Sequence, residues 1–365
     1  MRLGLHINTK SGNGFFGEPS VERDLQIDTM RRMGVTDCKL LCSGDSQLKA
    51  SKWLTEQGFA VMVRFYALPG ELPVPATDLM QLYADVGVRV AESVNEPELE
   101  QGPPSVELID QLAQQHIRFA DQCYRVGIKP VTPSIQGDRV FNYFEPLLDR
   151  IIGLGRKDAL EGSYIGCHPR PANNLPMTSP PGFVVRSYEL FDEAVRKRLG
   201  HSLPIYATEW GYEPGDNQNS ELPRISREMH SALNVRLAQT EWRPCLEVAY
   251  YWTWLNDWFE SGWWRGDVAS SLPVVKAFID MPKTAASLSD ADMRRIAEAH
   301  GQEIRIFPDG ALYKLAQAQG LGYPVCNEWQ SGGRIWQTFE RPDIKWKSIV
   351  SCRQQSYDDL RFVTW

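Results

Sequence analysis

Two glutamates stand where a pair of carboxylates could perform acid–base and nucleophilic chemistry together. Glu96 lies in ESVNEPEL and Glu209 in IYATEWGY, and each closes a short apolar run typical of a strand. In such a pair one carboxyl group protonates a leaving oxygen, while the other, ionised, attacks the anomeric carbon of a sugar. At a separation of about 5–5.5 Å, like-charge repulsion raises the pKa of the acid. Either glutamate alone could equally be a solvated loop carboxylate or part of an ion pair. Whether the two can act as a pair therefore depends on where the fold places them.

An alternating pattern of strands and helices would position these residues. Apolar runs rich in Val, Ile, Leu and Tyr alternate with segments of helical period, which is typical of βαβ units around a parallel sheet. Several predicted helices end at a glycine, such as Gly34 and Gly200, where the chain turns back into a strand. The predicted strands are Arg2–Asn8, Asp37–Ser43, Ala60–Ala67, Val88–Val94, Ile128–Ile135, Gly162–Cys167, Pro204–Thr208 and Leu246–Trp252.

This repeat predicts an α/β fold, a (β/α)8 TIM barrel over residues 1–280, with both glutamates at the C-terminal mouth. A doubly wound open sheet is the rival, but NTKSGNGFFGEPS after the first strand lacks the glycine fingerprint of that fold. Residues 281–290 resemble a linker. Residues 291–365 interleave aromatic residues with short strands and predict a small C-terminal α+β appendage of unassigned role.

With VNEPE after the fourth strand and ATEWGY at the seventh, the chain resembles clan A retaining glycoside hydrolases. The resemblance implies that Glu96 is the acid/base, that Glu209 is the nucleophile and that Asn95 donates to a sugar 2-hydroxyl. It further implies a retaining β-glycoside hydrolase that cleaves β-linked oligo- or polysaccharide by double displacement. The alternative from another class is a non-catalytic carbohydrate-binding TIM barrel, and the presence of both carboxylates favours the enzyme.

Further side chains are candidates for binding the substrate. His168, in IGCHPRPANN, matches the place where clan members often carry a histidine near the nucleophile. Tyr212 could donate a hydrogen bond to a carboxylate or could be a core aromatic. Arg64 and Lys39 could point into the barrel mouth, or form an internal ion pair with Glu92.

Five of the twelve tryptophans lie within residues 252–264. Flat aromatic faces suit stacking against the CH face of a sugar ring. By resemblance, Trp252 or Trp254 lines the subsite of the cleaved sugar, and Trp258, Trp263 and Trp264 form walls of neighbouring subsites. The alternative is that some of them plug the barrel mouth or contact the C-terminal module, and at least two of the five are expected to do so.

Charge and composition exclude other classes. The net charge of -7 indicates no excess of basic residues that could bind phosphates, so nucleic acid is not an expected partner. No stretch is long and apolar enough to cross a membrane. The N-terminus MRLGLHINTK lacks a secretory h-region, which predicts a cytoplasmic protein unless a leader was removed. The seven cysteines suggest small core residues in a reducing compartment, not a disulfide framework.

Neither a metal nor a cofactor is expected. The first strand carries His6 without the H-x-H pair of a TIM-type metallohydrolase. The segments EWGYEPGD and WLNDWFE, near the ends of the last two strands, are acidic and aromatic, which suits neutral sugars better than phosphate. The expected partner is therefore a carbohydrate substrate.

Overall fold

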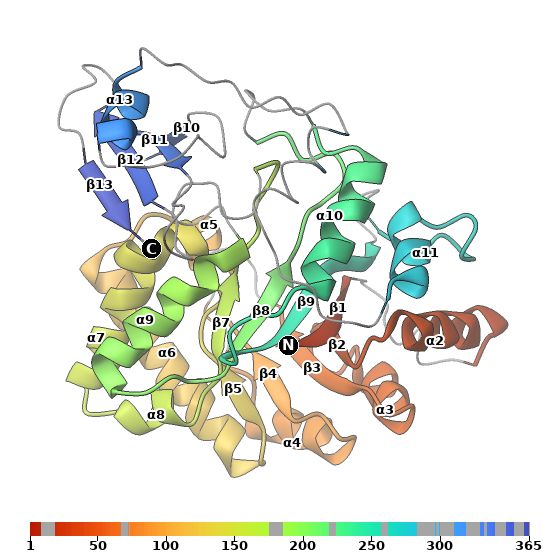
Figure 1. Ribbon diagram of the computed structural model, residues 1–365. Coiled ribbons are helices and arrows are strands. Elements are labelled where there is room, and N and C mark those ends of the chain that lie inside the picture. The colour runs from red at the N-terminus through yellow and green to blue at the C-terminus, as the bar shows by residue number, and fades with distance from the viewer. Residues whose placement is uncertain are drawn as a thin grey trace.

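The computed structural model describes residues 1–8, 19–66, 72, 74–174, 185–218, 224–256, 262–282, 296, 299, 310–318, 329–331, 334–339, 348–353 and 361–364. Its main sheet is parallel throughout and has the order β5-β4-β3-β2-β1-β9-β8-β7-β6 (Figure 1). The strands are β1 (Arg2–Asn8), β2 (Asp37–Cys42), β3 (Ala60–Phe65), β4 (Val90–Glu92), β5 (Lys129–Val131), β6 (Ile135–Gln136), β7 (Ile165–His168), β8 (Ile205–Trp210) and β9 (Leu246–Asn256). All eight predicted strands are present, the fifth as two pieces, β5 and β6.

The division of the fifth strand closes the ring. β5 pairs with β4, and β6 pairs with β7. Between the two pieces, Thr132 N donates to Tyr164 O at 2.9 Å and Ser134 N donates to Val94 O at 3.0 Å, so this segment bonds to both neighbours. Gly166 on β7 permits the close approach, because a Cβ there would lie 2.5 Å from Ser134 Oγ. The fold is a TIM barrel, as the sequence predicted, and the doubly wound alternative is excluded.

Helices surround the ring of strands (Figure 1). Three of them begin at a serine whose hydroxyl accepts a backbone N–H, as in Ser105 before α6. α2 ends at Gly34, whose φ of 85° is a left-handed conformation that a glycine adopts without steric cost. The helical elements of this region are α2 (Val21–Met33), α3 (Leu48–Glu56), α4 (Thr77–Asp85), α5 (Pro97–Glu100), α6 (Val106–Arg125), η1 (Gly137–Arg139), η2 (Val140–Phe144), α7 (Glu145–Gly153), α8 (Lys157–Glu161), η3 (Val185–Ser187), α9 (Tyr188–Leu199), α10 (Arg227–Gln239) and α11 (Pro273–Asp280).

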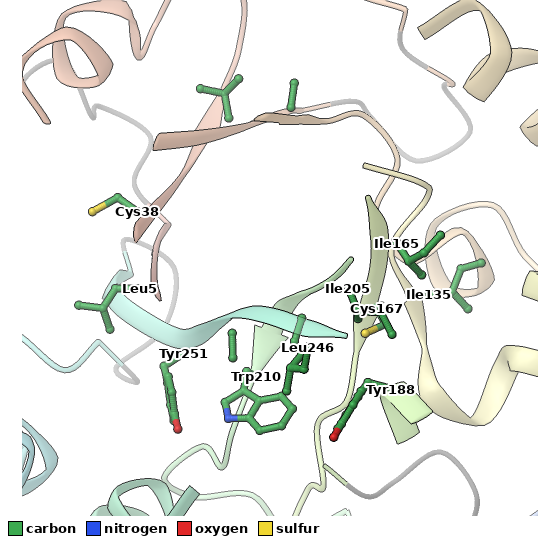
Figure 2. Packing of buried hydrophobic residues seen from close by; sticks show 14 of the residues in the cluster. Leu5, Cys38, Ile135, Ile165, Cys167, Tyr188, Ile205, Trp210, Leu246 and Tyr251 are labelled. Atoms are coloured by element: carbon green, nitrogen blue, oxygen red, sulfur yellow. The ribbon is translucent and has the colours of Figure 1, made fainter. Parts of the chain in front are cut away.

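The main core lies between the strands and the helices. β2 and β8 are buried along their whole length, as expected for strands covered on both faces. Figure 2 shows Leu5, Cys38 and Tyr251 pointing away from the ring of strands. Cys38, Cys42, Cys123, Cys167 and Cys245 are free, and all but Cys245 are buried, so these cysteines are small core residues as predicted.

A buried ion pair crosses the inside of the barrel. Lys39 Nζ lies 2.7 Å from Glu92 Oε2, and both side chains are inaccessible to solvent. The same ammonium donates to Thr208 O on β8 at 3.1 Å, so Lys39 links β2 to two strands that are not its neighbours. The alternative reading of Lys39, an internal ion pair with Glu92, is correct. Removing one partner would leave an uncompensated charge, which typically costs about 3–5 kcal/mol.

A second, antiparallel sheet lies near the C-terminus. It consists of β10 (Trp329–Ser331), β11 (Arg334–Phe339), β12 (Ser348–Arg353) and β13 (Arg361–Thr364). α13 (Ala311–Ala318) packs on it through Leu312 and Ala316, which contact Phe339. The predicted linker, 281–290, lies outside the described residues except for its first two positions. Of the helices described, none has both the length and the apolar composition that crossing a bilayer requires.

Candidate active site

The barrel brings the two glutamates to the same end. Glu96 follows β4 and precedes α5, and Glu209 lies near the end of β8. One oxygen of each carboxylate lies within 4.8 Å of the other. The Glu96 side chain is 17% exposed and that of Glu209 is 5% exposed. The two groups are therefore close enough to act on one bond.

Glu96 has an unusual backbone conformation. Its φ of 38° is in the left-handed region, which costs a residue other than glycine of order 1–3 kcal/mol. The hydrogen bond from Glu96 N to Ser134 O, 2.8 Å long, fixes this conformation against the neighbouring strand segment. With this turn the Glu96 carboxylate lies within hydrogen-bond reach of His168 and Gln136.

His168 lies between the two carboxylates. Its Nδ1 is 2.9 Å from Glu96 Oε1 and 3.9 Å from Glu209 Oε2, and its ring is fully buried. Burial opposes the charge on the ring, but the carboxylates of Glu209 and Glu96 outweigh it and raise the pKa of His168. In its charged form His168 donates to Glu96 and neutralises part of the paired negative charge.

This charged histidine reverses one expectation from the sequence. Like-charge repulsion was expected to raise the pKa of Glu96. Burial does raise it, but the charge and hydrogen bond of His168, a hydrogen bond from Gln136 and the charge of Arg170 together lower the pKa of Glu96 below its ordinary value. The proton of this acid–histidine pair therefore resides on His168 in the free protein.

Gln136 and Glu98 support Glu96 and were missed at the sequence level. Gln136 Nε2 donates to Glu96 Oε1 at 3.0 Å, and Gln136 N donates to Glu98 Oε1 at 2.6 Å. Burial raises the pKa of Glu98 to about 7, and the charge of Glu96 contributes in the same direction. Gln136 is the polar residue directly after the predicted fifth strand, and that position was the available signal.

Arg170 is the third residue of the site that the sequence did not reveal. Its guanidinium lies 3.3 Å from Glu209 Oε2 and also pairs with Glu213, and it sits 5.6 Å from the centroid of the Trp252 ring. A cation near the nucleophile was expected from an early strand, such as Arg64 on β3. It comes instead from the segment after β7, two residues beyond His168, where Arg170 N donates to His168 O at 2.9 Å.

Asn95 and Arg64 belong to a neighbouring network. Asn95 Nδ2 contacts Glu96 Oε2 at 3.4 Å and Glu100 Oε1 at 3.1 Å, so its amide already serves two carboxylates. Arg64 pairs with the same oxygen of Glu100 at 3.1 Å. Among the described residues Arg64 pairs with Glu100 and not with Glu209, so it reaches the site through Glu100 and Asn95.

The tryptophans divide between the site and the core. Trp252 is partly exposed, and its ring meets His6 edge-on with centroids 4.6 Å apart. Trp254 is fully buried, donates to Gln26 Oε1 at 2.7 Å and stacks on Trp264. Trp263 is also buried. The expectation that Trp263 and Trp264 form walls of neighbouring subsites was therefore wrong, because these rings pack in the core. Of the two alternatives for the subsite of the cleaved sugar, Trp254 is buried and Trp252 remains the candidate. Trp258 lies outside the described residues.

Tyr212 is a core residue. It is 1% exposed, and its hydroxyl donates to Asn174 O at 2.7 Å. Its backbone N–H donates to Asn234 Oδ1, and burial raises the pKa of the hydroxyl. The expectation that Tyr212 serves a carboxylate was wrong, because its donor is used inside the core.

The Glu96, His168 and Glu209 cluster has atoms of the kinds that bind metals. One ligand atom from each lies within 4.8 Å of the other two. A cation there would displace the proton of His168 and compete with Arg170, which already contacts Glu209. The chemistry of these groups therefore suits proton transfer and carboxylate attack better than metal binding.

Comparison with solved structures shows the fold alone. A GH5-4 broad specificity endoglucanase from Clostridium longisporum is 11% identical over 76% of this chain and 95% of its own, with a TM-score of 0.48. ScGas2 is 11% identical over 78% of this chain and 65% of its own, with a TM-score of 0.46. Fructose-bisphosphate aldolase from Plasmodium falciparum is 13% identical over 81% and 88%, with a TM-score of 0.43. The sequence matches no family model and no curated protein.

The endoglucanase and Gas2 are clan A TIM-barrel glycoside hydrolases, the group that the sequence motifs resemble. The third protein is an aldolase. The activity of this chain therefore has to be argued from its own side chains.

Proposed function

We propose that this protein is a retaining β-glycoside hydrolase in which Glu209 is the nucleophile and Glu96 the acid/base. The observation that carries the proposal is the approach of the two carboxylates to within 4.8 Å at the C-terminal mouth of the barrel. Retaining enzymes hold these groups about 5–5.5 Å apart, whereas inverting enzymes leave about 6.5–9.5 Å for a water. The spacing therefore supports a double displacement on a β-linked sugar.

In the first step Glu209 attacks the anomeric carbon and forms a glycosyl ester, while the glycosidic C–O bond breaks. The leaving oxygen takes the proton shared by Glu96 and His168. In the free protein this proton lies on His168 Nδ1, 2.9 Å from Glu96 Oε1, so it reaches the leaving group through Glu96. Arg170 orients Glu209 for the attack.

In the second step water attacks the ester and regenerates Glu209. Esterification removes one negative charge from beside His168, and the proton has left with the first product. Glu96 is then ionised and accepts a proton from the attacking water. The proton returns to the Glu96–His168 pair, so both residues recover their starting state.

One observation favours the alternative, a barrel that binds carbohydrate without cleaving it. The ion pair between His168 and Glu96 lowers the pKa of the expected acid, as an ion pair of purely structural role would also do. The two functions differ in whether a covalent intermediate forms.

A labelling experiment separates them. The protein is incubated with a panel of 2-deoxy-2-fluoro glycosides of glucose, xylose, mannose and galactose and then digested for peptide mass analysis. We expect one glycoside to add covalently to the peptide that contains Glu209, which also identifies the accepted sugar. Carbohydrate binding without labelling or turnover would establish the alternative.

A further inference from the structure

A cavity of about 320 Å³ opens at the N-terminal ends of the barrel strands. Arg2, Asp37 and Lys129, which line it, are the first residues of β1, β2 and β5. Glu96 and Glu209 lie at the other ends of their strands, so this cavity is distinct from the candidate active site. Tyr206 and Tyr250, which also line it, belong to a buried apolar cluster with Met62, Val131 and Val248.

One wall of the cavity has its charges satisfied internally. Arg2 pairs with Asp37 at 3.1 Å and with Glu247 at 2.9 Å. Arg2 also donates to the hydroxyl of Tyr206 at 3.0 Å. These contacts fix the side chains and leave this wall with two carboxylates against one cation.

The opposite wall carries two cations. Lys129 N donates to Arg89 O at 2.8 Å, which places the two residues side by side at the start of β4 and β5. Arg89 Nη1 donates to the carbonyls of Ala84 and Val88, and these bonds anchor the guanidinium. Among the described residues, neither Arg89 nor Lys129 forms an ion pair with a carboxylate. With Arg2 of the first wall, these two cations give the cavity three positive groups against two carboxylates.

Between the two walls lie aromatic rings. Tyr164 and Tyr206 stack with centroids 4.3 Å apart and planes 10° apart, and Tyr164 is partly exposed at the cavity. Gly127 adds no side chain, and a Cβ built there would meet no atom within 4 Å, so space remains beside Lys129. Cations beside aromatic rings in a cavity of this size suit a small molecule that joins an anionic group to a ring.

We propose that this cavity binds a ring compound of monosaccharide size that carries a carboxylate or a phosphate. The anionic group lies on Lys129 and Arg89, and the ring and its hydroxyls lie against Tyr164 and the Arg2–Glu247 wall. Because such a ligand contacts the starts of β1, β4, β5 and β9 together, it stabilises the folded barrel by mass action. The site is independent of the hydrolase proposal.

Titration calorimetry on the full chain tests this. The probes are glucuronate and glucose 6-phosphate, with glucose and inorganic phosphate as the ring alone and the anion alone. The variants are Lys129→Ala and Arg89→Gln, which change exposed side chains. Lys197→Ala is the matched control, because Lys197 is exposed on α9 and does not line the cavity. Circular dichroism verifies that each variant folds.

We expect at least one anionic ring compound to bind with Kd on the order of 1 mM or tighter, and more tightly than glucose or inorganic phosphate. Lys129→Ala and Arg89→Gln should each weaken it about tenfold or more, since a charged hydrogen bond contributes on that scale, and Lys197→Ala should not. Whether glucuronate or glucose 6-phosphate binds better distinguishes a carboxylate from a phosphate. Equal binding of glucose or of phosphate alone, no binding in this range, or wild-type binding by both cavity variants would each overturn the proposal.

Discussion

The guanidinium of Arg170 lies 3.3 Å from Glu209 Oε2 and pairs at the same time with Glu213. One cation thus holds two acidic side chains that flank the end of β8. It also faces the ring of Trp252, so Arg170 connects the expected nucleophile with the aromatic residue of the site. This arrangement restricts the positions that the Glu209 carboxylate can take.

Replacing Arg170 with Met should lower kcat about 100-fold with a small change in KM, because a misdirected nucleophile loses rate and not substrate affinity. The measurement is steady-state kinetics on the aryl glycoside of the sugar found by labelling. Arg156→Met is the control, since Arg156 pairs with Asp121 and Asp158 on the outer helices. An unchanged kcat in Arg170→Met would show that Arg170 has a structural role alone.

The two glutamates should respond differently to azide. Glu209→Ala should abolish hydrolysis of every substrate, because the group that attacks the anomeric carbon is gone. Glu96→Ala should keep activity on substrates with good leaving groups, and azide should accelerate it and yield the β-azide product. Product NMR distinguishes the cases. If both variants retain most of their activity, or if the first-formed product has the α configuration, the assigned roles are wrong.

The raised pKa of Glu98 predicts a pH-dependent stability. In the unfolded chain Glu98 ionises near 4.5, whereas in the folded protein it keeps its proton up to about 7. Between these values the folded state binds more protons than the unfolded state, so the contribution of Glu98 to the free energy of unfolding is lost as pH rises. At pH 8 the loss reaches at most about 3 kcal/mol, and less after screening of this partly exposed group.

Glu98→Gln should remove this pH-dependent contribution to the free energy of unfolding. The amide oxygen of the glutamine still accepts the Gln136 N–H but carries no charge. Urea unfolding at pH 5 and pH 8 measures the contribution. The free energy of unfolding of the variant minus that of the wild type should be more positive at pH 8 than at pH 5. The same difference at both pH values would mean that Glu98 ionises normally.

Two tryptophans two residues apart should affect different properties. Trp252→Ala should raise KM about tenfold, since it removes the aromatic face at the site. Trp254→Phe should leave KM unchanged and lower the free energy of unfolding by about 1–3 kcal/mol, because Gln26 loses its buried donor. Kinetics and urea unfolding of both variants provide the comparison. An effect of Trp254→Phe on KM without loss of stability would contradict the assignment of Trp254 to the core.

The sequence by itself determined the eight strand positions of the TIM barrel and the mouth at which Glu96 and Glu209 meet. Strand positions follow from local apolar runs and glycine-terminated helices, and parallel strands carry their C-terminal residues to one end. His168 directly follows a predicted strand, and the family resemblance placed it near the nucleophile.

Only the tertiary structure decided which side chains face the site. Trp252 and Trp254 differ by two positions and share a face in a regular strand, yet the pairing of β1 with β9 shifts register between Leu5 and Ile7, and Trp254 lies in the core. Tyr212 is adjacent in sequence to the site, but its hydroxyl finds a carbonyl in the core. The direction of the pKa shift of Glu96 could not be predicted from the sequence either, because it depends on His168, Gln136 and Arg170 from other strand ends. Distances between such groups arise when the ring closes and are not encoded in any one segment.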